Sequence, residues 1–300
     1  MTKSRIYAVT DVGSNTVKCS VYRVTNGRIE DIEFMSEKVG LIARVENNTL
    51  PDPAITLLCN TVSGYRKRAE ELGADRFCIF GTAIMRRIDN FGAVSRTLKE
   101  RIGVEIDLIS GEEEAQLSFT GARLVDGDVR TGVMADLGGA STELIAFEGD
   151  GITDLHSFPF GCLYLYDRFV KGRFPSADER AEITDFVSRE LAKYPITAVG
   201  RELILIGGTG KAIRKLLCKF GYDGRRNSVS VLDELADRLS RPDEKDIALL
   251  ERTIPSRVET VIPGLLAYVA AAKATDSEFF TVSDGGIREG YLKKLMAEEL

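Results

Sequence analysis

The chain has 300 residues, 29% of them charged and 44% hydrophobic, which is the composition of a folded globular protein of roughly two domains. Lys and Arg number 40 against 46 Asp and Glu, so the net charge of −6 argues against a nucleic-acid polymer as partner, and an anionic ligand needs a local positive pocket. The single histidine, His156, excludes phosphohistidine chemistry, HExxH zinc sites and His-Asp metal phosphohydrolase modules, which leaves carboxylates, hydroxyls, amides and cations for catalysis.

The first predicted elements are two strands joined by an acidic-glycine turn. Residues 5–10 form an apolar run that ends at Asp11-Val-Gly-Ser-Asn, and residues 17–24 alternate as a second strand. Asn26-Gly27 then supplies the positive φ angles that a two-residue hairpin turn requires. The chain therefore opens with a strand, an acidic-glycine turn, a second strand and a hairpin.

The next segment carries the first candidate catalytic group. Helical patterns at residues 54–72 and about 83–102 flank a strand at 76–80, and a strand at 105–109 leads into Ser110-Gly-Glu-Glu-Glu-Ala. Ser110 as N-cap with Glu113 three residues later is a capping box, which favours a structural role for Glu113. Glu114 lies one residue further round the helix. Facing a cleft, it could act as a general base on water, because carboxylates are the only plausible bases here.

The opening unit recurs 125 residues later, over residues 132–155. Aligning Asp136 with Asp11 places Gly138, Ser141 and Phe147 on Gly13, Thr16 and Tyr22. We expect the second hairpin turn at Asp150-Gly151. Internal duplication is the interpretation we favour, the alternative being a chance resemblance between two β-hairpins.

The remaining elements continue the alternation of strands and helices. Helices are predicted near residues 178–193, at 211–220, near 233–253 and at 263–273, with strands at 202–206 and 279–283 and a helix at the C-terminus. This alternation in both halves predicts an α/β protein with two related domains.

Five of the predicted strands end in small-residue turns, at residues 11–15, 81–83, 136–141, 207–210 and 283–286. Glycine lets the backbone approach a ligand and turn its N–H groups toward it, so each turn is a potential phosphate cradle, although any one alone is better explained as a tight turn. Two of them place an Asp just before the glycine turn. Facing each other across an interdomain cleft, these two would surround a polyanion with amides and hold a metal by carboxylates.

Five motifs in order resemble one known family over residues 5–295. They are Asp11-Val-Gly-Ser-Asn-Thr, Ile109-Ser-Gly-Glu-Glu-Glu-Ala, Asp136-Leu-Gly-Gly-Ala-Ser-Thr-Glu, Gly207-Gly-Thr and Ser283-Asp-Gly-Gly-Ile-Arg-Glu-Gly. They resemble the exopolyphosphatase and guanosine pentaphosphate phosphohydrolase family of the actin-like superfamily, in its short two-domain form. The resemblance implies two duplicated actin-like (ribonuclease H-like) domains with a cleft between them. We expect domain I at 1–122, joined by a C-terminal helix at about 287–300, and domain II at 123–286.

The resemblance also implies an activity, namely release of the terminal phosphate from inorganic polyphosphate, guanosine pentaphosphate or both. Glu114 would activate water for in-line attack, while Asp136 and Glu143, assisted by Asp11, would bind Mg²⁺ or another divalent cation. The expected phosphate-binding residues are Gly13, Ser14, Asn15, Lys18, Arg86, Gly138, Gly139, Ser141, Gly208 and Arg288.

Two positions depart from the family pattern. Ala140 stands where a third glycine is usual, and its methyl group is expected to narrow the phosphate loop. Lys18 replaces a common arginine, and a lysine cannot form a bidentate fork with phosphate. We expect these changes to alter substrate preference rather than abolish hydrolysis.

Two other functions remain open on the same fold, an ATP-dependent small-molecule kinase and a non-catalytic sensor of a polyphosphorylated ligand. The five cysteines have no CxxC spacing, which predicts small buried residues in a reducing compartment. Residues 261–274, the most apolar stretch, are too short to span a bilayer, and the N-terminus lacks a secretion pattern. We expect a cytoplasmic protein without a membrane partner, and a homodimer is left open.

Overall fold

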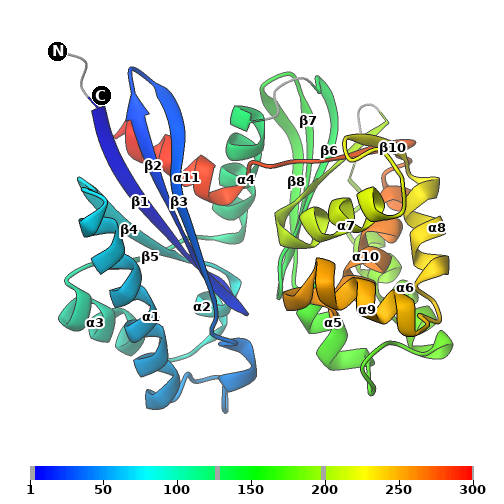
Figure 1. Cartoon of the computed structure of the whole chain (residues 1–300), viewed down its shortest axis with the longest axis horizontal. Coiled ribbons are helices and arrows are strands. Elements are labelled where there is room, and N and C mark those ends of the chain that lie inside the picture. Colours follow the sequence, from blue (N-terminus) through cyan, green and yellow to red (C-terminus); the bar gives the residue numbers. More distant parts are fainter. Residues whose placement is uncertain (1–3, 126–128, 197–200, 299–300) are drawn as a thin grey trace. The chain divides into compact units, whose positions relative to one another are not determined.

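The structure is a computed structural model that describes residues 4–125, 129–196 and 201–298. The chain divides into two compact units, each with its own β-sheet (Figure 1). Unit 1 comprises Met1–Glu114 with Tyr291–Leu300, and unit 2 comprises Ala115–Gly290. The division therefore falls within two helices, α4 (Gly111–Val125) and α11 (Ile287–Ala297), rather than in a linker.

Unit 1 is built on a five-stranded sheet in the order β3-β2-β1-β4-β5. Strand β1 pairs antiparallel with β2 and parallel with β4. Besides the ends of α4 and α11, its elements are β1 (Ser4–Val12), β2 (Thr16–Thr25), β3 (Arg28–Lys38), η1 (Ile42–Arg44), α1 (Asp52–Glu71), β4 (Arg76–Gly81), α2 (Ala83–Arg87), α3 (Phe91–Ile102) and β5 (Ile106–Leu108).

Unit 2 contains a six-stranded sheet in the order β10-β11-β9-β6-β7-β8. Its elements after α4 and before α11 are β6 (Thr131–Leu137), β7 (Thr142–Glu148), β8 (Gly151–Phe158), α5 (Cys162–Phe169), α6 (Ala177–Ala192), β9 (Glu202–Ile206), α7 (Gly207–Lys219), β10 (Arg226–Ser228), α8 (Ser230–Arg238), α9 (Glu244–Thr253), η2 (Pro255–Arg257), α10 (Val261–Ala274) and β11 (Phe279–Val282).

The two sheets have the same topology, so the predicted α/β fold with a duplicated unit is confirmed. Without the short strand β10, the order β8-β7-β6-β9-β11 repeats the order β3-β2-β1-β4-β5. Even an irregularity is repeated. The pairing register shifts between Val21 and Tyr22 in one unit and between Ala146 and Phe147, 125 residues later, in the other. A chance likeness of two hairpins does not reproduce a β-bulge at the same position.

The two hairpin turns differ, and the second was predicted one residue too late. Asn26 and Gly27 have φ angles of 52° and 80°, as a type I′ turn requires. In unit 2 the turn is Gly149-Asp150 rather than Asp150-Gly151, because Glu148 pairs with Gly151. Gly149 takes the positive φ, 59°, at the first turn position, where a type II′ turn demands it.

Two long helical predictions were wrong because each segment contains a break. Residues 83–102 form α2 and α3, separated where Asn90 exchanges two hydrogen bonds with the Leu50 backbone. Residues 233–253 contain the end of α8 and all of α9. Pro242 lies between them, and the Asp243 side chain caps α9 by accepting from Asp246 N at 2.8 Å. Local capping and a long-range contact outweigh the apolar period in these segments.

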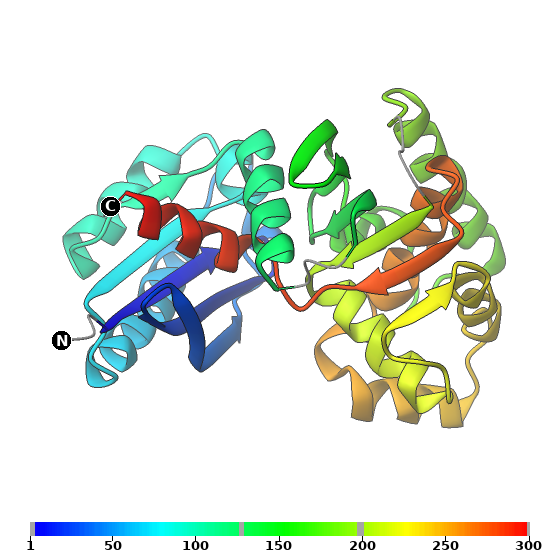
Figure 2. The ribbon, with the colours of Figure 1, turned by 90° about the horizontal axis from the view of Figure 1, so that it is seen from above.

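Each sheet buries an apolar face under helices. In unit 1, α1 and α3 cover one face, and α11 lies across the other (Figures 1 and 2). In unit 2, Val133, Ala135 and Leu137 of β6 point into the main core, which includes most of α10. Met134 points the other way, toward the apolar residues of α4. Side-chain alternation therefore sends Asp136 to the α4 face.

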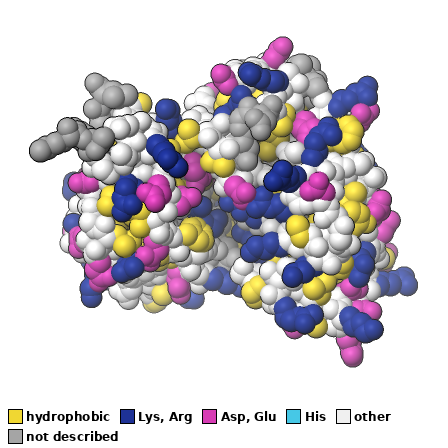
Figure 3. All heavy atoms as spheres, turned by 45° about the horizontal axis from the view of Figure 1, so that its top comes forward, with side chains coloured by type: hydrophobic (Ala, Val, Ile, Leu, Met, Phe, Trp, Pro, Cys, Tyr) yellow, Lys and Arg dark blue, Asp and Glu magenta, His cyan; other side chains and the backbone are white. Residues whose placement is uncertain are grey.

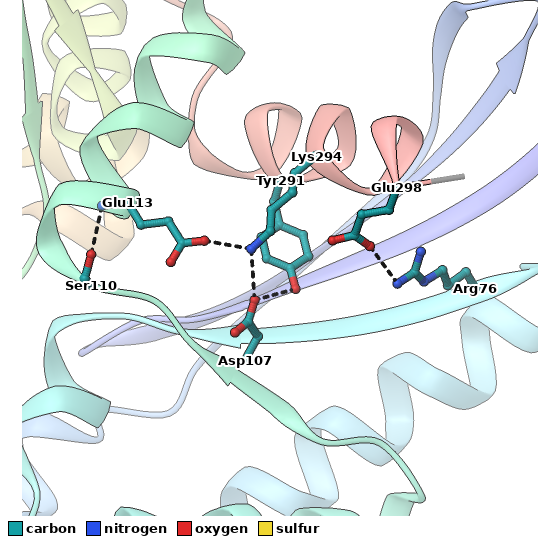
Figure 4. Close-up of polar contacts among 7 residues, drawn as sticks. All are labelled: Arg76, Asp107, Ser110, Glu113, Tyr291, Lys294 and Glu298. Atoms are coloured by element: carbon teal, nitrogen blue, oxygen red, sulfur yellow. Dashed lines mark hydrogen bonds and ion pairs between the residues drawn. The ribbon is translucent and has the colours of Figure 1, made fainter. Parts of the chain in front are cut away.

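The C-terminal end of α11 is fastened to unit 1 by a small polar network (Figure 4). The Lys294 ammonium donates to Glu113 at 2.7 Å and to Asp107 at 3.4 Å, and the Tyr291 hydroxyl donates to Asp107 at 3.0 Å. The Tyr291 ring stacks on Phe80 with centroids 4.7 Å apart. Burial alone would lower the pKa of Lys294, but the two carboxylates outweigh it and raise that pKa.

The surface in Figure 3 carries dark-blue Lys and Arg side chains interspersed with magenta Asp and Glu side chains. That face is therefore not uniformly basic, in keeping with the net charge of −6. Within the part of the chain that the structure describes, every helix is too short or too polar to cross a membrane.

Candidate active site

Glu114 is held by an arginine from a neighbouring helix of unit 1. The Arg86 guanidinium, at the end of α2, donates to Glu114 Oε2 at 2.8 Å and to the Ile109 carbonyl at 3.0 Å from the same nitrogen. The Glu114 side chain is 12% exposed, so it is largely withdrawn from water. Arg86 was predicted to extend a positive track for substrate. In the structure it engages the candidate base, while its neighbour Arg87 is exposed.

Glu113 has the structural role that the sequence favours, with a different partner for its side chain. Ser110 Oγ accepts from the Glu113 amide at 3.0 Å, which caps α4. The Glu113 carboxylate accepts from Lys294 of α11 rather than completing a capping box (Figure 4). Glu113 and Glu114 therefore serve different contacts, and Glu114 is the one engaged by Arg86.

Two candidate metal ligands lie directly opposite each other on neighbouring strands of unit 2. Asp136 on β6 and Glu143 on β7 are register partners, so their side chains share the α4 face of the sheet. Ser118 of α4, one helical turn after Glu114, donates to Asp136 at 2.5 Å, and Ser157 of β8 donates to Glu143 at 2.8 Å. Glu143 is almost fully buried. Hydroxyl donors thus orient both carboxylates.

The equivalent positions in unit 1 carry opposite charges. Asp11 on β1 is the register partner of Lys18 on β2, exactly as far along the duplicated unit as Asp136 and Glu143. An acid faces a base in unit 1, whereas an acid faces an acid in unit 2. Two adjacent carboxylates repel each other unless a cation or proton lies between them, so the unit 2 pair is the better metal-binding arrangement.

The glycine loop of unit 2 has a fixed orientation. The carbonyl of Gly138 accepts from Cys162 N, and that of Gly139 accepts from Leu163 N, each at 3.0 Å. Because a trans peptide unit points its C=O and its N–H in opposite directions, the amide N–H groups of Gly139 and Ala140 point away from α5. The Ala140 methyl group is buried, so it packs against protein. The loop therefore presents backbone donors on one side.

The matching loop in unit 1 is held in the same way. The carbonyls of Ser14 and Asn15 accept from Ile42 N and Gly40 N at 2.9 and 2.8 Å. A Cβ on Gly13 would lie 2.9 Å from the Thr16 carbonyl, and one on Gly138 would lie 3.2 Å from the Ser141 carbonyl. The backbones of the two loops are therefore equivalent, with glycine required at the same point of closest approach.

The predicted loop at 207–210 is instead the first turn of α7. Gly207 has a φ of +88°, and a Cβ there would come within 2.9 Å of Asp136 Oδ1. The N–H groups of this first turn have no intrahelical partner, as at any helix start, which makes the turn a site for an anion. Sequence analysis missed Arg257 of η2, which lies against Gly208 and donates to Thr209 Oγ1 at 3.2 Å. No sequence motif marks Arg257, because only folding brings it to α7.

The turn at 283–286 is part of a charged cluster with α7. Arg214 binds both carboxylate oxygens of Asp284, at 3.0 and 2.5 Å, and Lys211 donates to the Asp284 carbonyl at 2.8 Å. The Arg214 guanidinium holds the pKa of Asp284 below its usual value. Burial lowers the pKa of Lys211, and the charge of nearby Arg288 adds to that effect.

The donor set suits a divalent cation only in part. Among the described residues, no three His, Cys, Asp or Glu side chains are gathered in one place. Asp136 and Glu143 supply two hard oxygen ligands on one face of a sheet. Mg²⁺ is commonly held by one or two carboxylates with water and substrate phosphates completing its shell, so this pair fits that ion.

The sequence profile described as the Ppx/GppA phosphatase family matches residues 20–299 of this chain. Among curated proteins, the chain is 28% identical over 304 residues to a guanosine-5'-triphosphate,3'-diphosphate pyrophosphatase of Photobacterium profundum. It is 29% identical over 311 residues to the protein of that name from Vibrio cholerae. Each match covers 98% of this chain, which spans 60% of the length of these relatives.

Solved structures share the fold of the whole chain. The crystal structure of an Aquifex aeolicus member of the Ppx/GppA family superposes with a TM-score of 0.84 at 20% identity, covering 99% of both chains. A structure titled as an exopolyphosphatase from Cytophaga hutchinsonii gives a TM-score of 0.85 at 19% identity, covering 98% of both. At such identities the likeness establishes the fold.

Proposed function

The chain belongs to the Ppx/GppA phosphatase family, and from this premise we propose that it is a divalent-cation-dependent phosphohydrolase. The proposed reaction removes the terminal phosphate of inorganic polyphosphate, of guanosine pentaphosphate, or of both. The names of the relatives from Photobacterium profundum and Aquifex aeolicus support this class of substrate.

The observation that carries the proposal is the engagement of Glu114 by Arg86. Glycine loops that bind phosphate serve kinases, sensors and hydrolases alike, whereas a fixed carboxylate beside them serves a reaction in which water must lose a proton. Glu114 is largely buried and oriented by a 2.8 Å contact, which suits a general base. Glu114 accepts a proton from the attacking water as the new P–O bond forms and the bond to the leaving phosphate breaks.

Asp136 and Glu143 would hold the cation, and Asp11 would assist from the equivalent position of unit 1. A bound divalent cation supplies charge neutralisation for the phosphate oxygens in the transition state. Ser118 and Ser157 keep the two unit 2 carboxylates oriented for that task.

Backbone amides would hold the terminal phosphate. The loops at 13–15 and 138–141 have carbonyls tied back by hydrogen bonds, so their N–H groups are preorganised before substrate arrives. The first turn of α7 adds amides at Gly207 and Gly208, together with the Arg257 guanidinium. We assign the roles of Gly13, Ser14, Asn15, Gly138, Gly139, Ser141 and Gly208 on this basis.

The deciding experiment measures phosphate release from long-chain polyphosphate and from guanosine pentaphosphate side by side, with Mg²⁺ and with a chelator. We expect Mg²⁺-dependent release from at least one of the two. Tight binding of either compound without release over hours would instead identify a sensor, and transfer of the γ-phosphate of ATP to a small-molecule acceptor would identify a kinase.

A further inference from the structure

A second basic region lies in unit 2, at the C-terminal half of α7. A cavity of about 960 Å³ is bounded by α7, by the turn at 223–225 and by the end of α9. Its walls carry Lys215 and Lys219 of α7, Arg225 of the turn and Arg252 of α9. We call the space around these four cations the basic pocket.

The charge of the basic pocket is not compensated by the fold. Asp223 is the only acidic residue on its walls, and its carboxylate accepts from the Arg225 backbone amide at 2.8 Å. Arg214, also on the wall, is engaged by Asp284. Within residues 4–125, 129–196 and 201–298, none of the four defining cations forms an ion pair. Like charges brought together on a protein of net charge −6 favour a ligand with several negative charges.

Three separate elements deliver these cations, which general helix electrostatics does not explain. A helix C-terminus attracts cations from its own last turn, which accounts for Lys219. It does not account for Arg225 or Arg252, which come from a turn and from another helix. The turn is held close by Gly224, where a Cβ would lie 2.8 Å from Cys218 Sγ.

The basic pocket is continuous with the proposed active site along α7. Lys211, Arg214, Lys215 and Lys219 recur every three or four residues, which places them along one side of the helix. This side begins one turn after Gly207 and Gly208. At 1.5 Å per residue, Lys219 lies about 16 Å along the axis from Gly208, a distance that a polymeric anion can bridge.

We propose that the basic pocket is a second anion site, which binds a linear polyphosphate chain at a distance from its cleaved end. The inference rests on the proposed function. A polyphosphate chain is flexible and offers only charged oxygens, so mobile lysines and arginines on an open surface suit it better than a rigid cage. The ligand is therefore a chain long enough to reach both sites, and tripolyphosphate is too short to do so.

Cys218 provides a reporter inside the basic pocket. Its thiol is exposed, whereas Cys19, Cys59, Cys78 and Cys162 are buried, so the prediction of five buried cysteines was wrong for Cys218. An uncharged alkylating reagent will therefore modify Cys218 first, and Cys218→Ser gives the background. We expect long-chain polyphosphate to slow this alkylation in metal-free protein, and tripolyphosphate or NaCl of equal ionic strength to leave it unchanged. Equal alkylation with and without long-chain polyphosphate would overturn the proposal.

Paired variants test the same site by affinity. Lys215→Ala/Lys219→Ala should raise the Kd for long-chain polyphosphate about tenfold, and its KM with it, because two phosphate contacts are lost. Turnover of tripolyphosphate should not change. The matched control is Arg241→Ala/Lys245→Ala, which removes two exposed cations of unit 2 outside the basic pocket. An equal effect of both double variants, or none, would contradict the proposal.

The outcomes separate this inference from the proposed function. Protection of Cys218 in a protein that releases no phosphate from any substrate would refute the activity and leave the anion site standing. An active enzyme with unprotected Cys218 and an unchanged KM in the double variant would refute the site alone. A single-stranded oligouridylate of equal charge that protects Cys218 at lower concentration than polyphosphate would overturn the assigned ligand.

Discussion

The Arg86 guanidinium and the Glu114 carboxylate meet at 2.8 Å in unit 1, with the same arginine nitrogen held by the Ile109 carbonyl. This contact joins the end of α2 to the first turn of α4. It fixes where the proposed base lies and gives Arg86 a task other than contacting substrate. The first two predictions follow from this relationship.

Glu114→Gln keeps the size of the side chain and its ability to accept from Arg86, but removes the basic oxygen. We expect kcat to fall by about 10²–10⁴-fold, with the affinity for substrate retained. The measurement is phosphate release under saturating polyphosphate or guanosine pentaphosphate. Glu112→Gln, on the same helical turn, is the matched control and should keep wild-type turnover. Full activity of the Glu114 variant would remove it as the base.

Arg86→Met should lower kcat by about 10–100-fold through a displaced Glu114, while KM changes little. Direct binding of the phosphate chain by Arg86 would give the opposite result, a raised KM with kcat preserved. Steady-state kinetics with each substrate distinguish the two. Arg87→Met on the same helix is the control, since Arg87 is exposed and lies outside this contact.

Glu143→Gln should weaken the response to metal, because one of two opposed carboxylates loses its charge. We expect the Mg²⁺ concentration for half-maximal activity to rise about tenfold or more. A titration with Mg²⁺ and, separately, with Mn²⁺ measures this. Glu148→Gln, at the exposed end of the same strand, should leave the titration unchanged. A shift of equal size in both variants would argue against Glu143 as a ligand.

The Asp284–Arg214 pair predicts a contribution to stability that is lost in acid. The pKa of Asp284 is lowered in the folded protein, so the pair stabilises above the unfolded-state pKa of about 3.9 and loses its effect as the pH falls through the lower folded value. Asp284→Asn should reduce the free energy of unfolding at pH 7 by less than about 1 kcal/mol, because the carboxylate is half exposed.

The same variant should lose less of its stability than the wild type between pH 5 and the acid limit. Urea unfolding at a series of pH values gives both curves. Asp185→Asn is the control, because Asp185 is exposed and its side chain makes no ion pair within the described part of the chain. Parallel curves for wild type and Asp284→Asn would show that the pair does not titrate as stated.

Gly121→Ala should destabilise unit 2 by about 1–3 kcal/mol, because α4 and the start of α11 are in backbone contact there. A Cβ at Gly121 would lie 1.8 Å from the Gly286 carbonyl oxygen. Gly64→Ala in α1 has no atom within 4 Å of the new methyl group and should stabilise by about 0.5–1 kcal/mol. Opposite shifts in the midpoint of chemical unfolding are the expected result, and similar shifts would contradict this account.

Local patterns sufficed where the physics is local. The Asn26-Gly27 turn, the Ser110 cap and the alternation of β2 follow from φ preferences, short-range hydrogen bonds and a two-residue period. They failed where a distant residue intervenes. The break after α2 depends on the bond between Asn90 and Leu50, forty residues apart. Helix α7 begins at Gly207 rather than Lys211, although glycines are poor helix formers.

The sequence by itself determined the duplicated α/β fold and the candidate residue types, because apolar periods, glycine turns and repeated motifs are written along the chain. It placed Glu114, Asp136 and the glycine loops as candidates. Tertiary structure decided their partners. Arg86 meets Glu114, Arg257 meets the start of α7, and Lys215 meets Arg252 at one pocket, since electrostatic contacts depend on distance in space and carry no signal in sequence order.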